Sequence, residues 1–97
     1  MLFICDEIQT GLGRTGKLLA SQHDGVKPDA IVLGKALGGE ILPVSVFLSS
    51  KEVMDVFMTG DNGSIFGGIP LEAAVGWAAL DVCVSDTLTK RAETRVA

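Results

Sequence analysis

The sequence predicts an α/β domain, and three observations support this fold class. Short, continuous apolar runs over residues 2–5 and 30–34 are typical of strands covered on both faces, as in a parallel sheet. A third run, over residues 43–49, is rich in β-branched and aromatic residues and indicates a further strand. Residues 70–84 combine an opening proline with a regular apolar stripe, which predicts a helix. Strands that alternate with helices favour an α/β architecture.

The first half of the chain places polar groups directly after its predicted strands. The first strand ends at two acids, Asp6 and Glu7, and a glycine-rich loop over residues 11–16 comes next. Residues 17–23 have room for about two helical turns. The second strand is followed at once by Lys35, so both strands lead into residues that carry chemistry.

The second half predicts one short and one longer helix after the third strand. Ser50 is a suitable N-cap for a helix over residues 51–58, and a glycine-rich loop over residues 59–69 comes next. The last residues, 87–97, suggest a further helix. The apolar stripe expected to pack the longer helix consists of Leu71, Ala74, Val75, Ala78 and Val82.

Composition excludes several classes of partner. The 97 residues are 47% apolar with a net charge of -4, and no stripe of Lys or Arg is available to neutralise nucleic-acid phosphates. No apolar run approaches the roughly 20 residues needed to cross a bilayer, so no membrane partner is expected. Cys5 and Cys83 are far apart and are interpreted as buried thiols in a reducing compartment, without a metal site.

The glycines at positions 11, 13 and 16 match the G-x-G-x-x-G pattern of dinucleotide-binding turns. In that fold a full crossover helix comes after the glycines. Only a short segment separates Gly16 from the turn at Pro28, which leaves no room for such a helix. The favoured interpretation is therefore a flexible loop that matches the pattern by chance.

Asp6 and Lys35 are the strongest candidates for chemistry. Asp6 is either a ligand-binding carboxylate at the end of a buried strand or a surface acid, and position alone does not separate the two. Lys35 alone is best explained as a snorkelling side chain. Together, an acid after one strand and a lysine after the next suit pyridoxal phosphate, which needs a lysine for its aldehyde and an acid for its ring nitrogen. Ser64 either donates to a phosphate or serves the turn alone.

Four segments carry a resemblance to a known family. "LFICDEIQTGLGRTG", "KPDAIVLGKALGG", "PVSVFLSS" and "GSIFGGIPL" resemble the class III (subgroup II) pyridoxal-phosphate aminotransferases, in that family's order and spacing. Ornithine-type members are the most similar. The resemblance implies the large domain of fold-type I, a mainly parallel sheet with flanking helices and one antiparallel strand, here "PVSVFLS".

The resemblance also implies roles for individual residues. Asp6 would pair with the pyridinium nitrogen, and Gln9 would hydrogen-bond near the phenolic oxygen of the cofactor. Lys35 would form the Schiff base with pyridoxal 5'-phosphate and then move a proton. Ser64 would reach the phosphate of the partner subunit's cofactor, because members of this family are homodimers that act on amino acids and 2-oxo acids. The full-length protein would transfer the δ-amino group of ornithine to a 2-oxo acid.

Three positions depart from the family pattern. At Ile65 the family has a threonine that donates to phosphate, and at Ile69 it has an asparagine that suits a helix cap. Glu40 stands where a further glycine is usual, which removes the freedom to adopt a positive φ. These departures are consistent with a catalytically inactive relative.

Residues 1–97 are expected to form part of the large, pyridoxal-phosphate-binding domain, without its upstream part and without the C-terminal small domain. The first residues already resemble the middle of a sheet, which suggests a fragment that does not catalyse transamination alone. Two alternatives to an ornithine-type enzyme stay open: a class III aminotransferase for acetylornithine or 4-aminobutyrate, and an inactive truncated relative. The compartment is expected to be cytoplasmic or mitochondrial.

Overall fold

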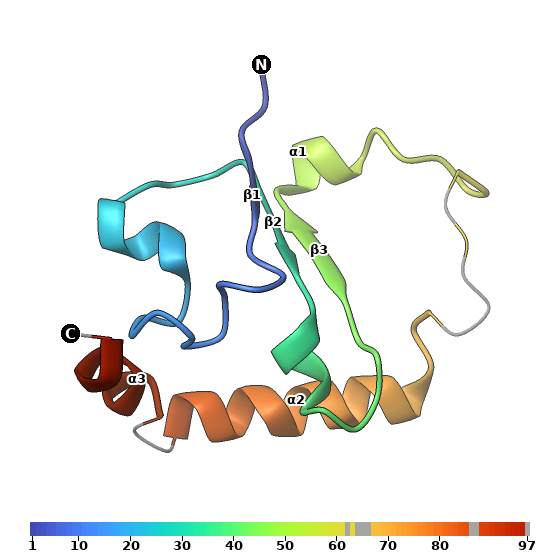
Figure 1. Ribbon diagram of the computed structural model, residues 1–97. Coiled ribbons are helices and arrows are strands. Elements are labelled where there is room, and N and C mark those ends of the chain that lie inside the picture. The colour runs from blue at the N-terminus through green and yellow to red at the C-terminus, as the bar shows by residue number, and fades with distance from the viewer. Residues whose placement is uncertain (62, 64–66, 86–87, 97) are drawn as a thin grey trace.

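A three-stranded mixed sheet forms the centre of the protein (Figure 1). The computed structural model describes residues 1–61, 63, 67–85 and 88–96. The strands lie in the order β1 (Ile4–Asp6), β2 (Ala30–Leu33) and β3 (Val46–Ser49); β1 and β2 are parallel, whereas β2 and β3 are antiparallel. The antiparallel third strand is the one that the family resemblance implies.

Helical segments surround this sheet on several sides. The longest, α2 (Pro70–Ser85), runs past the carboxyl ends of β1 and β2, and η2 (Lys35–Gly38) lies between it and the strands (Figure 1). The described helices are η1 (Ala20–Asp24), η2 (Lys35–Gly38), α1 (Lys51–Met54), α2 (Pro70–Ser85) and α3 (Leu88–Val96). No helix in the described ranges combines the length and apolar character required to span a bilayer.

The helix after β3 is shorter than the sequence predicts, and its hydrogen bonds give the reason. Ser50 is the N-cap as expected, because its side chain accepts a hydrogen bond from the Val53 backbone. The amides of Val56 and Phe57 donate three residues back, to Val53 and Met54, instead of four. The expected helix over 51–58 therefore ends at Met54 and continues as tight turns.

The core is small and lies between β2, the loop after β1 and η2. Its buried cluster consists of Leu12, Leu33 and Leu37, with Ala30 also buried. The expectation that the first strand is covered on both faces was wrong, because Ile4 keeps half of its surface exposed. β1 is an edge strand of the described sheet, so no further strand shields its outer side.

The face by which α2 packs also differs from the predicted stripe. Among residues 70–84, whose burial is described, Gly76 is the one buried residue, and an added Cβ there would lie 3.6 Å from Val44 and 3.8 Å from the Leu37 side chain. Leu80 and Cys83 continue this inward face, whereas Leu71 is 61% exposed. The helix is apolar on nearly every side, so hydrophobic periodicity could not identify the face that packs.

Asp29 connects the start of β2 to both neighbouring strands. The backbone N–H of Phe3 donates to Asp29 Oδ2 at 2.7 Å, and Ser49 Oγ donates to the Asp29 carbonyl, also at 2.7 Å. These bonds fix the end of the sheet that lies away from η2. The parallel register then determines which residues emerge side by side at the carboxyl ends of β1 and β2.

Candidate active site

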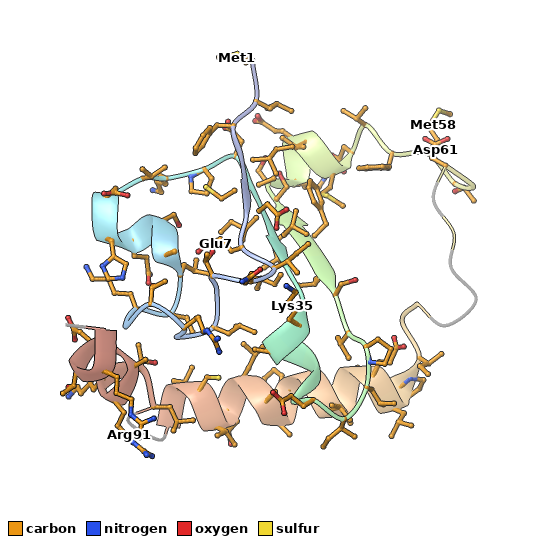
Figure 2. The ribbon with its side chains drawn as sticks, viewed as in Figure 1. Met1, Glu7, Lys35, Met58, Asp61 and Arg91 are labelled. Carbon is orange, nitrogen blue, oxygen red and sulfur yellow. The ribbon has the colours of Figure 1, made fainter. Side chains whose placement is uncertain are left out.

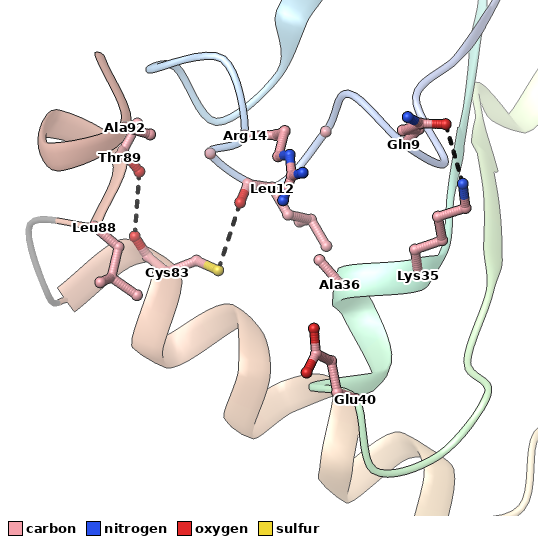
Figure 3. Close-up of a pocket in the computed structure, with 12 residues that line it drawn as sticks. Gln9, Leu12, Arg14, Lys35, Ala36, Glu40, Cys83, Leu88, Thr89 and Ala92 are labelled. Carbon is pink, nitrogen blue, oxygen red and sulfur yellow. Dashed lines mark hydrogen bonds between the residues drawn. The ribbon is translucent and has the colours of Figure 1, made fainter. Parts of the chain in front are cut away.

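The register of β1 and β2 brings Gln9 and Lys35 together. Asp6 lies opposite Val32 in the parallel ladder, and the Glu7 amide donates to the Val32 carbonyl at 2.9 Å. Gln9 stands three residues beyond Asp6, and Lys35 stands three residues beyond Val32. Lys35 Nζ donates a hydrogen bond to Gln9 Oε1 at 3.1 Å (Figure 3). Two polar residues predicted separately from the sequence are thus in contact.

Lys35 occupies an unusual backbone conformation at the first position of η2. Its φ is 43°, in the left-handed region that non-glycine residues rarely adopt. Holding a non-glycine residue there costs on the order of 1–2 kcal/mol, and such strain is concentrated at functional sites. Its side chain is exposed, so the amine is accessible to a ligand.

Asp6 lies at the carboxyl end of β1, the position that left open a ligand-binding carboxylate or a surface acid. The residue is exposed, and its Oδ1 accepts a hydrogen bond from the Ile8 amide at 3.1 Å. Asp6 lines one hollow, together with Thr10 and Ser21, whereas Lys35 lines another. The structure therefore places Asp6 at the same sheet edge as Lys35 but not in the same hollow.

The hollow beside Lys35 has a volume of about 530 Å³ and mixes charged and apolar walls. Figure 3 shows Arg14 and Glu40 entering it from opposite sides, from the loop after β1 and from the end of η2. Sequence reasoning did not single out Arg14. The residues that line the hollow include Gln9, Leu12, Arg14, Lys35, Glu40 and Thr89.

Glu40 has a φ of 61°, so this position does require the left-handed backbone that glycine provides. The sequence prediction that glutamate is a poor substitute here is consistent with this geometry. The carboxylate also lines the hollow beside Lys35, where it adds a negative charge opposite two cationic side chains.

Glu7 is the acid of this region that sequence reasoning passed over. It is 3% exposed, and its carboxylate accepts hydrogen bonds from the Ala20 backbone and from Ser21 Oγ. Figure 2 shows Glu7 directed toward η1, on the side away from Lys35. Successive side chains at a strand end point to opposite faces, so two adjacent acids there imply that one of them faces inward. This alternation could have identified Glu7 from the sequence as the acid that faces inward.

The glycine loop after β1 has a packing role. Gly11, Gly13 and Gly16 are all buried, and a Cβ at Gly16 would lie 2.6 Å from the Glu93 side chain of α3. Between β1 and β2 the only helix is the five-residue η1, so the crossover helix of a dinucleotide-binding fold is absent from this fully described segment. The loop packs against α3, at Thr89 and Glu93.

The remaining predicted positions lie in several parts of the chain. Ser64 and Ile65 lie outside the described residues. The Ile69 carbonyl accepts the first hydrogen bond of α2, from Ala73 at 3.2 Å, so an isoleucine without a side-chain acceptor occupies the cap position.

Cys5 and Cys83 are free thiols that are half-buried, not fully buried as expected. The described part of the chain contains no group of three acidic, histidine or cysteine residues suited to a metal ion.

Three side chains have the chemistry that pyridoxal phosphate needs, although Asp6 lines a different hollow from Lys35 and Gln9. An accessible amine, a carboxylate and an amide lie at the carboxyl edge of two adjacent parallel strands, at Lys35, Asp6 and Gln9. An amine can bind the aldehyde of this cofactor, and a carboxylate can pair with its ring nitrogen. The carboxyl edge of parallel strands is also where α/β proteins bind their ligands.

Known proteins match nearly the whole of this chain. The sequence profile of aminotransferase class-III matches residues 1–97. Ornithine aminotransferase 2 of Staphylococcus aureus is 59% identical over 91 residues, which are 94% of this chain and 23% of that protein. The chain thus spans about a quarter of the length of the curated relatives it matches.

Two solved structures share the fold closely. One is the ornithine aminotransferase of Toxoplasma gondii, with a TM-score of 0.94 and 50% identity over 97% of this chain and 22% of the other; pyridoxal phosphate partially occupies its active site. The other is the acetylornithine aminotransferase of Elizabethkingia anophelis, with a TM-score of 0.93 and 53% identity over 97% of this chain and 23% of the other.

Proposed function

Because this chain belongs to the class III aminotransferase family, we propose that it is the cofactor-lysine segment of an ornithine-type aminotransferase. The whole enzyme would transfer the δ-amino group of ornithine to a 2-oxo acid. The observation that carries the proposal is the contact between Lys35 Nζ and Gln9 Oε1 at the edge of the sheet where Asp6 ends β1. The identity to an ornithine aminotransferase of Staphylococcus aureus supports the substrate.

Pyridoxal 5'-phosphate would supply an electron sink for the carbon that carries the amino group. The Lys35 amine would hold the aldehyde of the cofactor and, once the substrate amine replaces it, carry a proton on Nζ. Asp6 would keep the ring nitrogen protonated through its carboxylate. Gln9 would orient Lys35 before the cofactor binds and would then direct its side-chain amide toward the phenolic oxygen of the cofactor.

Two further features belong to the same proposal. The three described strands would be part of a larger, mainly parallel sheet in the large domain of a fold-type I enzyme. The whole protein would act as a homodimer, in which Ser64 contacts the phosphate of the partner subunit's cofactor. Both features are proposed from the family and not from contacts in this chain.

Acetylornithine is the second candidate substrate. The acetylornithine aminotransferase of Elizabethkingia anophelis is 53% identical to this chain, which is as similar as the ornithine enzymes of known structure. This segment therefore supports the reaction type more strongly than the choice between the two amino donors. The runner-up is a class III aminotransferase that acts on acetylornithine.

Absorbance spectroscopy tests the proposal. Pyridoxal phosphate is added to the purified chain, and the spectrum is compared with those of Lys35→Ala and Asp6→Asn. We expect a Schiff-base band that Lys35→Ala loses and that Asp6→Asn shifts, because the asparagine no longer pairs with a protonated ring nitrogen. An identical spectrum for the wild-type chain and Lys35→Ala would contradict the assignment of Lys35.

A further inference from the structure

Glu7 is the one buried charged residue in the described part of the chain, and the proposed chemistry does not use it. A carboxylate that is 3% exposed has lost most of its water and must be stabilised by hydrogen bonds. Oε1 accepts from the Ala20 amide and from Thr10 Oγ1 at 3.4 Å, and Oε2 accepts from Ser21 Oγ at 3.0 Å. Every one of these donors belongs to a loop or to the start of η1.

The main chain of Glu7 holds both ends of the turn after β1. Its N–H donates to the Val32 carbonyl at 2.9 Å, which continues the β1–β2 ladder by one bond. Its carbonyl accepts from the Gly11 amide at 3.0 Å, which closes residues 7–11 into a turn. A Cβ at Gly11 would lie 2.8 Å from that carbonyl, so glycine is required for the turn to close this tightly.

Gln9 lies at the middle of the turn closed by Glu7. Its side chain extends from the turn across to η2, where its amide oxygen accepts a hydrogen bond from Lys35 Nζ at 3.1 Å. The next residue, Thr10, donates a hydrogen bond from its hydroxyl to the Glu7 carboxylate. The position of Gln9 is thereby linked to a carboxylate that itself does not contact Lys35.

We propose that Glu7 is a positioning residue: its buried carboxylate anchors the 7–11 turn to η1 and so fixes the Gln9 amide against the Lys35 amine. This inference adds a residue to the proposed cofactor site and rests on that function for its significance. It makes Glu7 important for where Lys35 points and not only for stability. In this arrangement the two adjacent acids have different roles: Asp6 would contact the cofactor, whereas Glu7 holds the 7–11 turn against η1.

Competitive acylation of lysines tests this role without the cofactor. The chain is treated with a limiting amount of an acylating reagent, and mass spectrometry gives the ratio of labelling at Lys35 to labelling at Lys51. Lys51 is a suitable reference because it lies on α1 and pairs with Asp55, away from the turn. Far-UV circular dichroism confirms that each variant is folded under the labelling conditions.

We expect Gln9→Ala to raise the ratio about threefold, because the wild-type amine must give up one hydrogen bond before it attacks. Glu7→Gln should raise it by a similar factor, since an amide cannot accept all the bonds that the carboxylate accepts. The double variant should match Gln9→Ala alone, because Glu7 acts through Gln9. Ser21→Ala, a milder change, should move the ratio in the same direction.

A merely structural Glu7 gives a different result. Glu7→Gln would then lower the free energy of unfolding while leaving the labelling ratio at its wild-type value. Either this outcome or a multiplicative, about ninefold effect in the double variant would overturn the proposal. The control Glu72→Gln on α2 should also leave the labelling ratio at its wild-type value. Because the reagent is not pyridoxal phosphate, failure of cofactor binding would contradict the proposed function and leave this measurement unaffected.

Discussion

At the scale of single residues, backbone strain surrounds the candidate site. Three non-glycine residues of the described chain have a positive φ: Leu12 at 59°, Lys35 at 43° and Glu40 at 61°. All three line the hollow beside Lys35, although they come from two separate segments. Such conformations persist only where the surrounding contacts enforce them, so their clustering supports a functional site independently of residue chemistry.

The strain at Glu40 can be measured directly. We expect Glu40→Gly to raise the free energy of unfolding by about 0.5–1 kcal/mol, because relief of the left-handed strain exceeds the greater freedom of glycine in the unfolded chain. Chemical denaturation with an unchanged m-value measures this. Glu40→Gln serves as the control, since it removes the charge and keeps the strain. A less stable glycine variant would show that the φ at this position is not strained.

At the scale of elements, the sheet is held at one end by Asp29 and at the other by the segments that contain Glu7 and Lys35. Asp29 Oδ2 accepts from the Phe3 amide at 2.7 Å, so it sets where β1 begins against β2. The register fixed there carries through to the pairing of Asp6 with Val32. The contact between Gln9 and Lys35 therefore depends on an interaction at the opposite end of the strands.

Loss of the hydrogen bond between Asp29 and the Phe3 amide should weaken the attachment of β1 to β2. We expect Asp29→Ala to reduce the free energy of unfolding by about 1 kcal/mol, the typical net value of one hydrogen bond. Exchange of the Phe3 amide hydrogen should become faster, because it loses its acceptor. Asp29→Asn keeps a side-chain oxygen and should behave nearly as the wild type. If all three proteins exchanged the Phe3 amide at the same rate, Asp29 would have no role in fixing the register.

Much of this element pattern was predictable from the sequence, and the exceptions have physical causes. Apolar runs identified the three strands, and Ser50 and Pro70 identified two helix starts. The packing face of α2 was not predictable, because its apolar residues surround the helix. Lys35 was predicted as a candidate, but its contact with Gln9 is between residues 26 apart in the sequence and requires the strand register.

At the scale of the whole molecule, the chain is flat and leaves much apolar surface exposed. Its principal dimensions are 45 × 34 × 18 Å. On α2, Trp77 is 77% exposed and Val84 is 71% exposed, one above the other at helical spacing. Exposed large apolar side chains of this kind favour association. The family relatives, of which this chain spans about a quarter, have additional chain with which to cover it.

This exposed surface predicts self-association of the isolated chain. Sedimentation should show an average mass that rises with concentration, and the emission of Trp77, the single tryptophan, should shift to the blue over the same range. Val84→Lys should raise the midpoint of association about tenfold, since it removes roughly 1.5 kcal/mol of apolar burial. Thr94→Lys on α3 adds the same charge elsewhere and should have little effect. A wild-type chain that stays monomeric throughout would contradict this prediction.

The central claim is that Lys35 is the lysine that binds the cofactor, and peptide mapping tests it most directly. The chain is incubated with pyridoxal phosphate, reduced with borohydride, digested, and the modified lysines are quantified by mass spectrometry. We predict that the adduct forms at Lys35 well ahead of Lys17, Lys27, Lys51 and Lys90, and that Gln9→Ala changes the yield at Lys35 alone. An adduct spread evenly over all five lysines would mean that Lys35 is an ordinary surface amine, which would contradict the account.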